Sequence, residues 1–147
     1  MAITAVENPL EKGLAALEHG HTYLAMTCLQ QAMESGKTPL LVSWLAYCMA
    51  LNFKDMDRAV TFAREALLAE PERADICLNA GRTLLIAGFR EEAIRAFRLG
   101  LATGRDERLI VELDRLGNRR QPLFRKLPRG HFLNRCGGLL LSRLGLR

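Results

Sequence analysis

The sequence predicts an all-α fold built as a stack of antiparallel helix pairs. Side chains of matching size recur every 34 residues, as at Ala25, Ala59 and Ala93. Leu and Ala outnumber Val, Ile and Thr, and only five of the 147 residues are prolines, which favours helices over strands. Within each 34-residue unit the apolar residues follow helical spacing. A fixed period of this length indicates one helical unit copied three times, because each copy buries its apolar face against its neighbours.

The period divides the chain into five segments. Three repeats are expected at about 6–38, 39–72 and 73–105, and each should hold two helices. A capping helix is expected at 106–117, because a terminal unit needs a polar outer face. Residues 118–147 form a basic C-terminal extension whose last part, from His131 to Leu144, has the spacing of a helix.

The third repeat shows the helix pair most clearly. One amphipathic helix is expected over Arg73–Ala87 and a second over Arg90–Ala102, with Gly88 between them. Gly88 and Gly20 are expected to form left-handed turns, since glycine adopts that conformation at least cost. Lys54 occupies the equivalent place in the middle repeat.

Composition narrows the class of protein. The chain is 49% hydrophobic and 25% charged, which is typical of a soluble globular domain. The first residues lack the pattern of a secretory signal, and no run of 18 apolar residues could span a membrane. The four cysteines form no CxxC pair, so we expect buried apolar thiols in a reducing, cytoplasmic setting, with neither a disulfide nor a metal site. They are Cys28, Cys48, Cys77 and Cys136.

The repeat resembles the tetratricopeptide repeat (TPR), whose pattern is Gly, large, Gly, Ala, aromatic, small, Leu. The resemblance covers residues 6–105. Trp44 departs from the pattern, because it precedes Tyr47 by three residues where the family's tryptophan precedes its small residue by four. A rotation or one-residue shift of that helix is therefore left open. The third repeat carries the pattern at Gly81, Leu84, Gly88, Ala93, Phe97, Gly100 and Leu101.

The resemblance implies a right-handed superhelical solenoid whose first helices line a concave groove. Such a largely apolar groove would bind an apolar or amphipathic peptide segment of another protein, with Trp44 and Arg82 as candidate anchors. The alternative is that the chain's own tail covers it. By the 34-residue register the groove-facing residues are Leu10, Leu14, Leu17, Leu41, Trp44, Cys48, Asn52, Asp75, Leu78, Arg82 and Ile86.

Chaperone-binding members of the family hold a peptide's terminal carboxylate with a clamp of Lys, Asn, Asn, Lys and Arg. None of the corresponding residues in this chain is a cation, so no binding to chaperone C-termini is expected. These residues are Leu10, Leu14, Leu45, Asp75 and Asn79.

Charge is distributed unevenly along the chain. Residues 1–104 carry a net charge of −2 and residues 105–147 a net charge of +7. The extension could fold back on the repeats, lie on an anionic membrane surface as a basic amphipathic helix, or contact nucleic-acid phosphates. The basic tail comprises Arg119, Arg120, Arg125, Lys126, Arg129, Arg135 and Arg143.

No set of residues points to catalysis. The chain has no glycine-rich phosphate loop and no spacing of acids or histidines that completes a metal or acid–base site. We therefore expect a non-enzymatic scaffold or adaptor without a cofactor, which binds another protein. The alternatives are a membrane- or nucleic-acid-associated scaffold that uses its tail, and a noncatalytic secretion or assembly chaperone. Self-association through the open ends of the stack is a further alternative.

Overall fold

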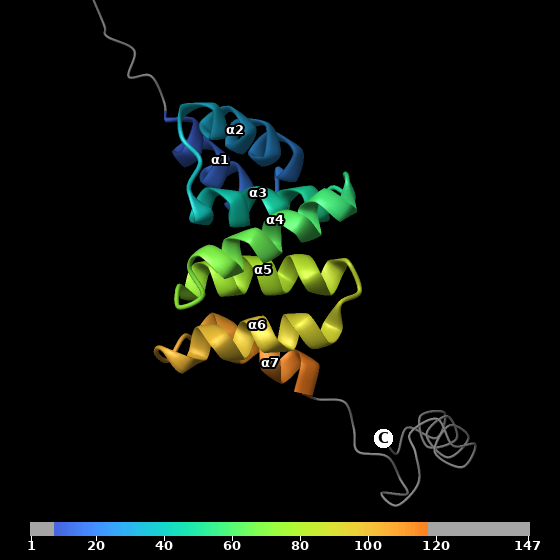
Figure 1. Ribbon diagram of the computed structural model, residues 1–147. Coiled ribbons are helices and arrows are strands. Elements are labelled where there is room, and N and C mark those ends of the chain that lie inside the picture. The colour runs from blue at the N-terminus through green and yellow to red at the C-terminus, as the bar shows by residue number, and fades with distance from the viewer. Residues whose placement is uncertain (1–7, 118–147) are drawn as a thin grey trace, which may run out of the picture. The chain divides into compact units, whose positions relative to one another are not determined.

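The computed structural model describes residues 8–117, and all regular structure in that range is α-helical (Figure 1). The prediction of an all-α fold is therefore confirmed. The predicted C-terminal helix and the basic tail residues from Arg119 to Arg143 lie outside the described residues. The helices are α1 (Pro9–Glu18), α2 (Thr22–Ser35), α3 (Pro39–Leu51), α4 (Met56–Ala69), α5 (Ala74–Ile86), α6 (Arg90–Ala102) and α7 (Glu107–Gly117).

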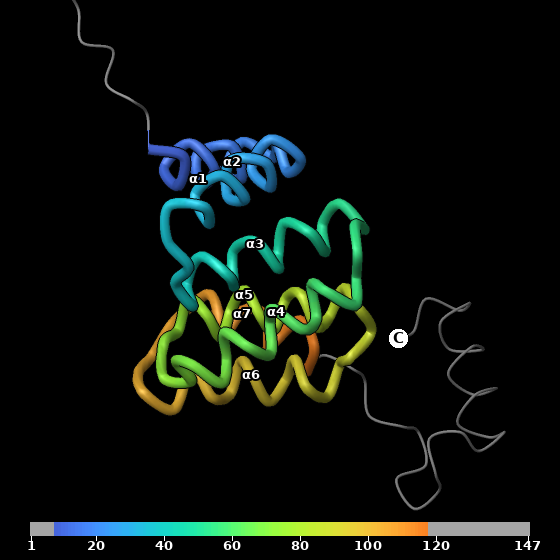
Figure 2. Tube along the Cα trace, turned by 45° about the horizontal axis from the view of Figure 1, so that its top comes forward, coloured from blue at the N-terminus to red at the C-terminus, as the bar shows by residue number. Residues whose placement is uncertain are grey.

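Consecutive helices form antiparallel pairs: α1 with α2, α3 with α4, and α5 with α6. The chain reverses direction after each helix (Figure 2). α3 packs against α5 as well as against α4, so the first helices of these two pairs lie side by side. α7 follows α6 as a first helix, and no second helix for it lies within the described range.

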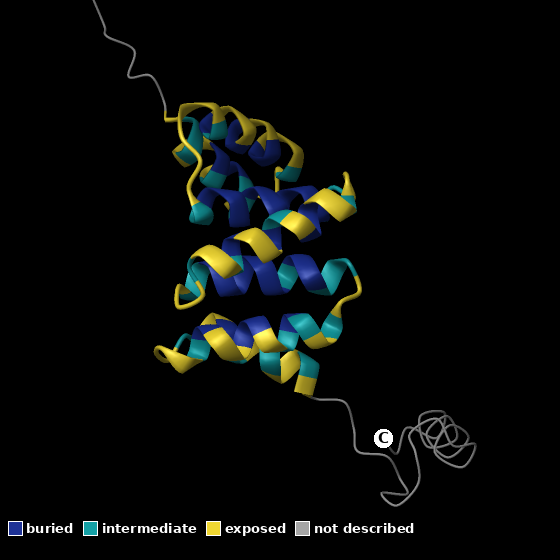
Figure 3. Ribbon diagram, viewed as in Figure 1, coloured by how far each residue is buried: buried dark blue, intermediate teal, exposed yellow. Residues whose placement is uncertain are grey.

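The core is centred on α3, which contains no charged residue. α3 contacts α2, α4 and α5, and it is apolar around most of its circumference because it is covered on several sides. The second helices carry exposed residues along their outer sides (Figure 3). Ala25, Ala59 and Ala93 on these helices are fully buried, as expected for close helix approach.

Side-chain caps and prolines fix where several helices begin. Asn8 accepts a hydrogen bond from the Leu10 amide at 3.1 Å, and Thr38 Oγ1 accepts one from the Leu41 amide at 3.2 Å. Each cap is followed by a proline in the first helical turn, where a missing amide hydrogen costs nothing. These local signals are readable from the sequence and are independent of the tertiary packing.

Gly20 and Gly88 have φ angles of 77° and 89°, which confirms their predicted left-handed conformation. The middle repeat differs from the prediction. Lys54 does not take the left-handed conformation there, whereas Phe53 and Asp55 do, with φ angles of 50° and 47°. The turn between α3 and α4 spans four residues, 52–55, while the turns of the other two pairs span three.

The extra turn residue shifts α3 by one position relative to the other first helices. Gly13 and Gly81 are buried where their helices cross the second helix of the pair, and the 34-residue register assigns Tyr47 to the same place. The structure instead places Ala46 there, fully buried beside Ala63, and leaves Tyr47 half-buried. The assignment of Tyr47 to the small-residue position is therefore wrong.

The strained turn gives a stability prediction. Phe53 is 79% exposed, so its side chain contributes little burial, while its left-handed backbone costs about 1 to 2 kcal/mol relative to glycine. Phe53→Gly should stabilise the fold by about 0.5 to 1 kcal/mol after the larger unfolded-state entropy of glycine is subtracted. Lys54→Gly is the matched control and should not stabilise. Denaturant unfolding of both variants tests this. If Lys54→Gly raised the free energy of unfolding and Phe53→Gly did not, Lys54 would be the left-handed residue, as the 34-residue register predicts.

The described cysteines give a second prediction. Cys28, Cys48 and Cys77 are free and buried, as expected from the sequence. Burial raises the pKa of Cys48 to about 12 and that of Cys77 to about 11. Since the thiolate is the reactive form, Cys48 should react with a disulfide reagent at pH 8 about 1,000-fold more slowly in the folded chain than in guanidinium. A Cys136→Ser background isolates these thiols, and rapid labelling of Cys48 with the helical signal intact would contradict its burial.

Candidate functional site

The candidate partner surface lies on the first helices. We call it the first-helix face and define it by five half-buried side chains: Leu14 on α1, Trp44 and Tyr47 on α3, and Arg82 and Ile86 on α5. Trp44 and Ile86 pack with one side against the main core cluster, which holds them in place. Trp44 and Tyr47 are three residues apart and therefore share one side of α3. Four of the five side chains are apolar or aromatic.

The structure divides the predicted groove residues into two sets. Leu41, Cys48 and Leu78 are no more than 4% exposed, so they offer a partner almost no surface. The shift of α3 turns Leu41 and Cys48 into the core, and α5 is covered by α3, α4 and α6. The remaining predicted residues are half-buried: Leu10, Leu14, Leu17, Trp44, Asn52, Asp75, Arg82 and Ile86.

Arg82 is the polar centre of the first-helix face. Its Nε donates a hydrogen bond to Glu112 Oε1 of α7 at 2.7 Å, and its guanidinium carbon lies 5.7 Å from the centre of the Tyr47 ring. The Arg82 side chain is 31% exposed, whereas that of Glu112 is only 9% exposed. Arg115 Nη1 lies 3.9 Å from the other Glu112 oxygen. One aromatic residue, one cation and one buried carboxylate from three successive first helices thus form a fixed cluster.

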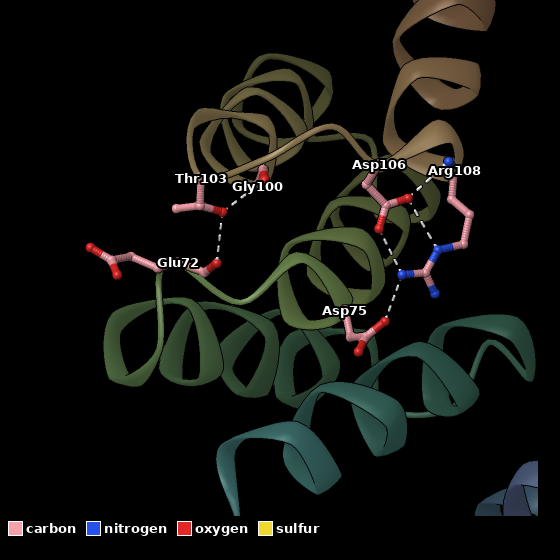
Figure 4. A network of polar contacts seen from close by, with 6 residues as sticks. All are labelled: Glu72, Asp75, Gly100, Thr103, Asp106 and Arg108. Carbon is pink, nitrogen blue, oxygen red and sulfur yellow. Dashed lines mark hydrogen bonds and ion pairs between the residues drawn. The ribbon is translucent and has the colours of Figure 1, made fainter.

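Asp75 takes part in a second polar contact between α5 and α7 (Figure 4). Arg108 Nη2 lies 2.8 Å from Asp75 Oδ1 and 2.7 Å from Asp106 Oδ2. The hydrogen bond from Arg108 lowers the pKa of Asp106, and the bonds to Asp106 and Asp75 raise the pKa of Arg108. Asp75 is therefore already paired with a cation.

Asn52 links neighbouring helices through its side chain. Its Oδ1 accepts a hydrogen bond from Thr22 Oγ1 of α2 at 2.9 Å, and its Nδ2 donates to the Cys48 carbonyl at 2.7 Å. Both ends of the amide are used inside the fold, so we leave Asn52 out of the partner surface.

Two of the residues assigned to the chaperone clamp are also buried. Leu45 is 3% exposed, and the shift of α3 puts Trp44 in its place. Asn79 is fully buried, and its Nδ2 donates to Ser43 Oγ at 3.1 Å, while its Oδ1 has no partner within the described residues. With the corrected register, Trp44 replaces Leu45 among the residues that correspond to the clamp. Neither Trp44 nor Asn79 is a cation, so we still predict no carboxylate clamp.

Sequence reasoning missed Tyr47 and Glu112 as members of this face. The 34-residue register assigns Tyr47 to a helix crossing. The spacing of three residues between Trp44 and Tyr47, where the family has four, was the sequence signal for a one-residue shift of this helix. Glu112 carries no signal in the sequence, because an acid in an amphipathic helix is normally solvated. Its role depends on Arg82, which is 30 residues away in the chain.

The rest of the described chain shows neither a metal site nor a membrane span. No group of three or more His, Cys, Asp or Glu residues in residues 8–117 could hold a metal ion. Within that range no helix is long and apolar enough to cross a membrane. His19 and His21 lie in the turn between α1 and α2, and both are exposed.

A comparison with solved structures identifies the fold. The chain resembles the crystal structure of the Sgt2 TPR domain from Aspergillus fumigatus, with a TM-score of 0.57 and 16% sequence identity over 86% of this chain and 91% of that one. The fold is thus TPR-like, as the 34-residue pattern predicted. No protein-family model matches the sequence. No curated protein sequence matches it either.

Proposed function

We propose that this chain is a protein-interaction scaffold that holds an apolar or amphipathic peptide segment of a partner on its first-helix face. The observation that carries the proposal is the side-by-side placement of Arg82 and Tyr47 on the first-helix face, whose other members are Leu14, Trp44 and Ile86. Trp, Tyr and Arg are the residue types that most often supply binding energy at protein interfaces.

The binding groups are largely pre-ordered. Trp44 and Ile86 are held against the core, and Arg82 is held by Glu112 and by the Tyr47 ring. Side chains that are already fixed lose less conformational entropy when a partner binds, so more of the contact energy appears as affinity. A scaffold of stacked helices suits this role because stacked repeats present an extended surface to a partner.

The proposal assigns no catalytic step to the chain. The described cysteines with raised pKa values are poor nucleophiles, because their thiolate forms are rare at neutral pH. Arg82, the one ionised side chain of the first-helix face, is engaged in an ion pair that joins α5 to α7. We therefore propose binding, without a cofactor, as the activity of this surface.

Trp44 provides a direct assay, since it is the only tryptophan in the chain. Peptides selected from a random 12-residue display library on the full chain should shift the emission of Trp44 when titrated. Tyr47→Ala should weaken their binding at least tenfold, which corresponds to about 1.4 kcal/mol. Phe53→Ala removes an aromatic side chain that lies in the turn after α3, and this control should change the affinity less than threefold. Selected peptides that bind without affecting Trp44, or that depend equally on Phe53, would place the partner surface elsewhere.

The charge asymmetry supports a second candidate, a scaffold that uses residues 118–147 to associate with an anionic membrane or nucleic acid. Those residues hold eight basic and no acidic side chains. Binding through them should fall steeply between 50 and 200 mM salt, as is typical of phosphate contacts. Binding on the first-helix face should change little over that range. Replacing Arg119, Arg120, Arg125 and Lys126 with glutamine in the full chain should abolish only the salt-sensitive binding.

A further inference from the structure

We infer that the partner segment of the first-helix face presents an acidic side chain, Asp or Glu, to Arg82, with apolar residues on either side of it. This inference rests on the proposed function and names the chemistry of the ligand.

The orientation of Arg82 leaves one edge of its guanidinium group available. A guanidinium group offers five N–H donors along two edges, and Glu112 occupies the Nε donor at 2.7 Å. No hydrogen bond from Nη1 or Nη2 of Arg82 joins it to another described residue. The pair formed by Nη1 and Nη2 matches the spacing of a carboxylate, which can then accept two parallel hydrogen bonds.

The surroundings of Arg82 favour an anionic ligand. Arg82 and Arg115 carry two positive charges near the single negative charge of Glu112, so the cluster keeps a net charge of +1. The Tyr47 ring lies beside the guanidinium group, and the Arg82 side chain is only 31% exposed. A carboxylate bound there is attracted more strongly than it would be by a fully solvated arginine.

A cationic ligand is disfavoured on the same face. Glu112 is 9% exposed, so its carboxylate is not accessible to a partner's lysine or arginine. Asp75 already binds Arg108. The other residues that define the first-helix face are Leu14, Trp44, Tyr47 and Ile86, which carry no charge. The only charged group on this face that can reach a ligand is therefore a cation.

The test uses the full chain and a random 12-residue peptide display library. We expect the selected peptides to carry Asp or Glu at a fixed distance from apolar residues. A synthetic peptide of the selected sequence should lose at least tenfold in affinity when that Glu is changed to Gln, since hydrogen bonds to charged groups contribute that much. Against the Arg82→Gln variant the same peptide change should cost less than threefold.

A second variant covers the case in which Arg82→Gln does not fold. Arg82→Lys keeps the positive charge beside Glu112 but cannot form two parallel hydrogen bonds. The peptide change from Glu to Gln should therefore cost at least threefold less against Arg82→Lys than against the unchanged chain. Circular dichroism verifies that each variant remains helical before its affinity is measured.

The outcomes separate this inference from the proposed function. Peptides that shift Trp44 emission but show no acidic preference would overturn the inference and leave the proposed function standing. An acidic preference that stays as large in Arg82→Gln and Arg82→Lys as in the unchanged chain would come from other cations, such as those of the basic extension, and would also overturn it. Selected peptides that do not affect Trp44 would overturn the proposed function itself.

Discussion

Gly81→Ala is expected to destabilise the fold by about 1 to 2 kcal/mol, although alanine is the better helix former. A Cβ atom at this position would lie 2.2 Å from Cε1 of Phe97 and 2.6 Å from Cδ1 of the same ring. The Phe97 ring is fully buried, so moving it away would displace the side chains packed around it. Overpacking of this kind costs about 1 to 3 kcal/mol or more, which exceeds the gain of about 1 kcal/mol in helix propensity. Urea unfolding followed by circular dichroism measures the change.

The middle repeat supplies the control for this prediction. There the equivalent pair is Ala46 and Ala63, so a methyl group at the crossing is tolerated when the facing residue is small. Phe97→Ala alone should cost about 3 to 5 kcal/mol, because it leaves a cavity. In the Phe97→Ala background, however, Gly81→Ala should cost nothing or stabilise slightly. An equal cost of Gly81→Ala in both backgrounds would show that its effect does not come from the Phe97 ring.

Arg82→Met is expected to destabilise the fold by about 3 kcal/mol, mainly through Glu112. The Glu112 carboxylate is 9% exposed and would lose its partner at 2.7 Å, leaving only Arg115 at 3.9 Å. Removing one member of a buried ion pair leaves a charge without compensation, which costs more than the pair contributes when it is intact. Loss of one partner of a buried ion pair usually costs about 3 to 5 kcal/mol. We take the lower end of that range because the Arg82 side chain is 31% exposed.

The double variant Arg82→Met, Glu112→Leu tests this explanation. With both charges removed, the stability should return to within about 1 kcal/mol of the unchanged chain, since apolar residues of similar size can replace a buried pair. The exposed pair between Arg105 and Glu107 is the matched control, and its removal should have an effect below about 0.5 kcal/mol. A double variant as unstable as Arg82→Met would show that Arg82 acts through its contact with Tyr47 instead.

The helices and turns could be predicted because their causes are local. Apolar spacing, the prolines after Asn8 and Thr38, and the two turn glycines act within a few residues of the structure that they determine. The bounds expected for the third helix pair differ from those of α5 and α6 by no more than one residue at each end. Local signals of this kind need no knowledge of which helices become neighbours.

The candidate site could be predicted only in part. Trp44 and Arg82 were identified from residue type and from the resemblance, and both are half-buried on the first-helix face. The membership of Tyr47 and Glu112 depends on contacts between residues about 30 or more positions apart in the chain. Leu41 and Cys48 were misplaced because a change of one residue rotates a helix by about 100°, which moves a side chain from one face to another.

The sequence by itself determined the 34-residue period, the all-α class, the turn glycines and the register of the second helices. Only the tertiary structure decided the register of α3. The turn after α3 is one residue longer than in the other pairs, and the connection before α3, at residues 36–38, is one residue shorter than the one at 70–73. The two changes in length cancel, so the second helices keep the 34-residue period while α3, which lies between the two connections, is shifted by one residue. Packing against α4 selects this slip, because it places the small Ala46 rather than the bulky Tyr47 against Ala63.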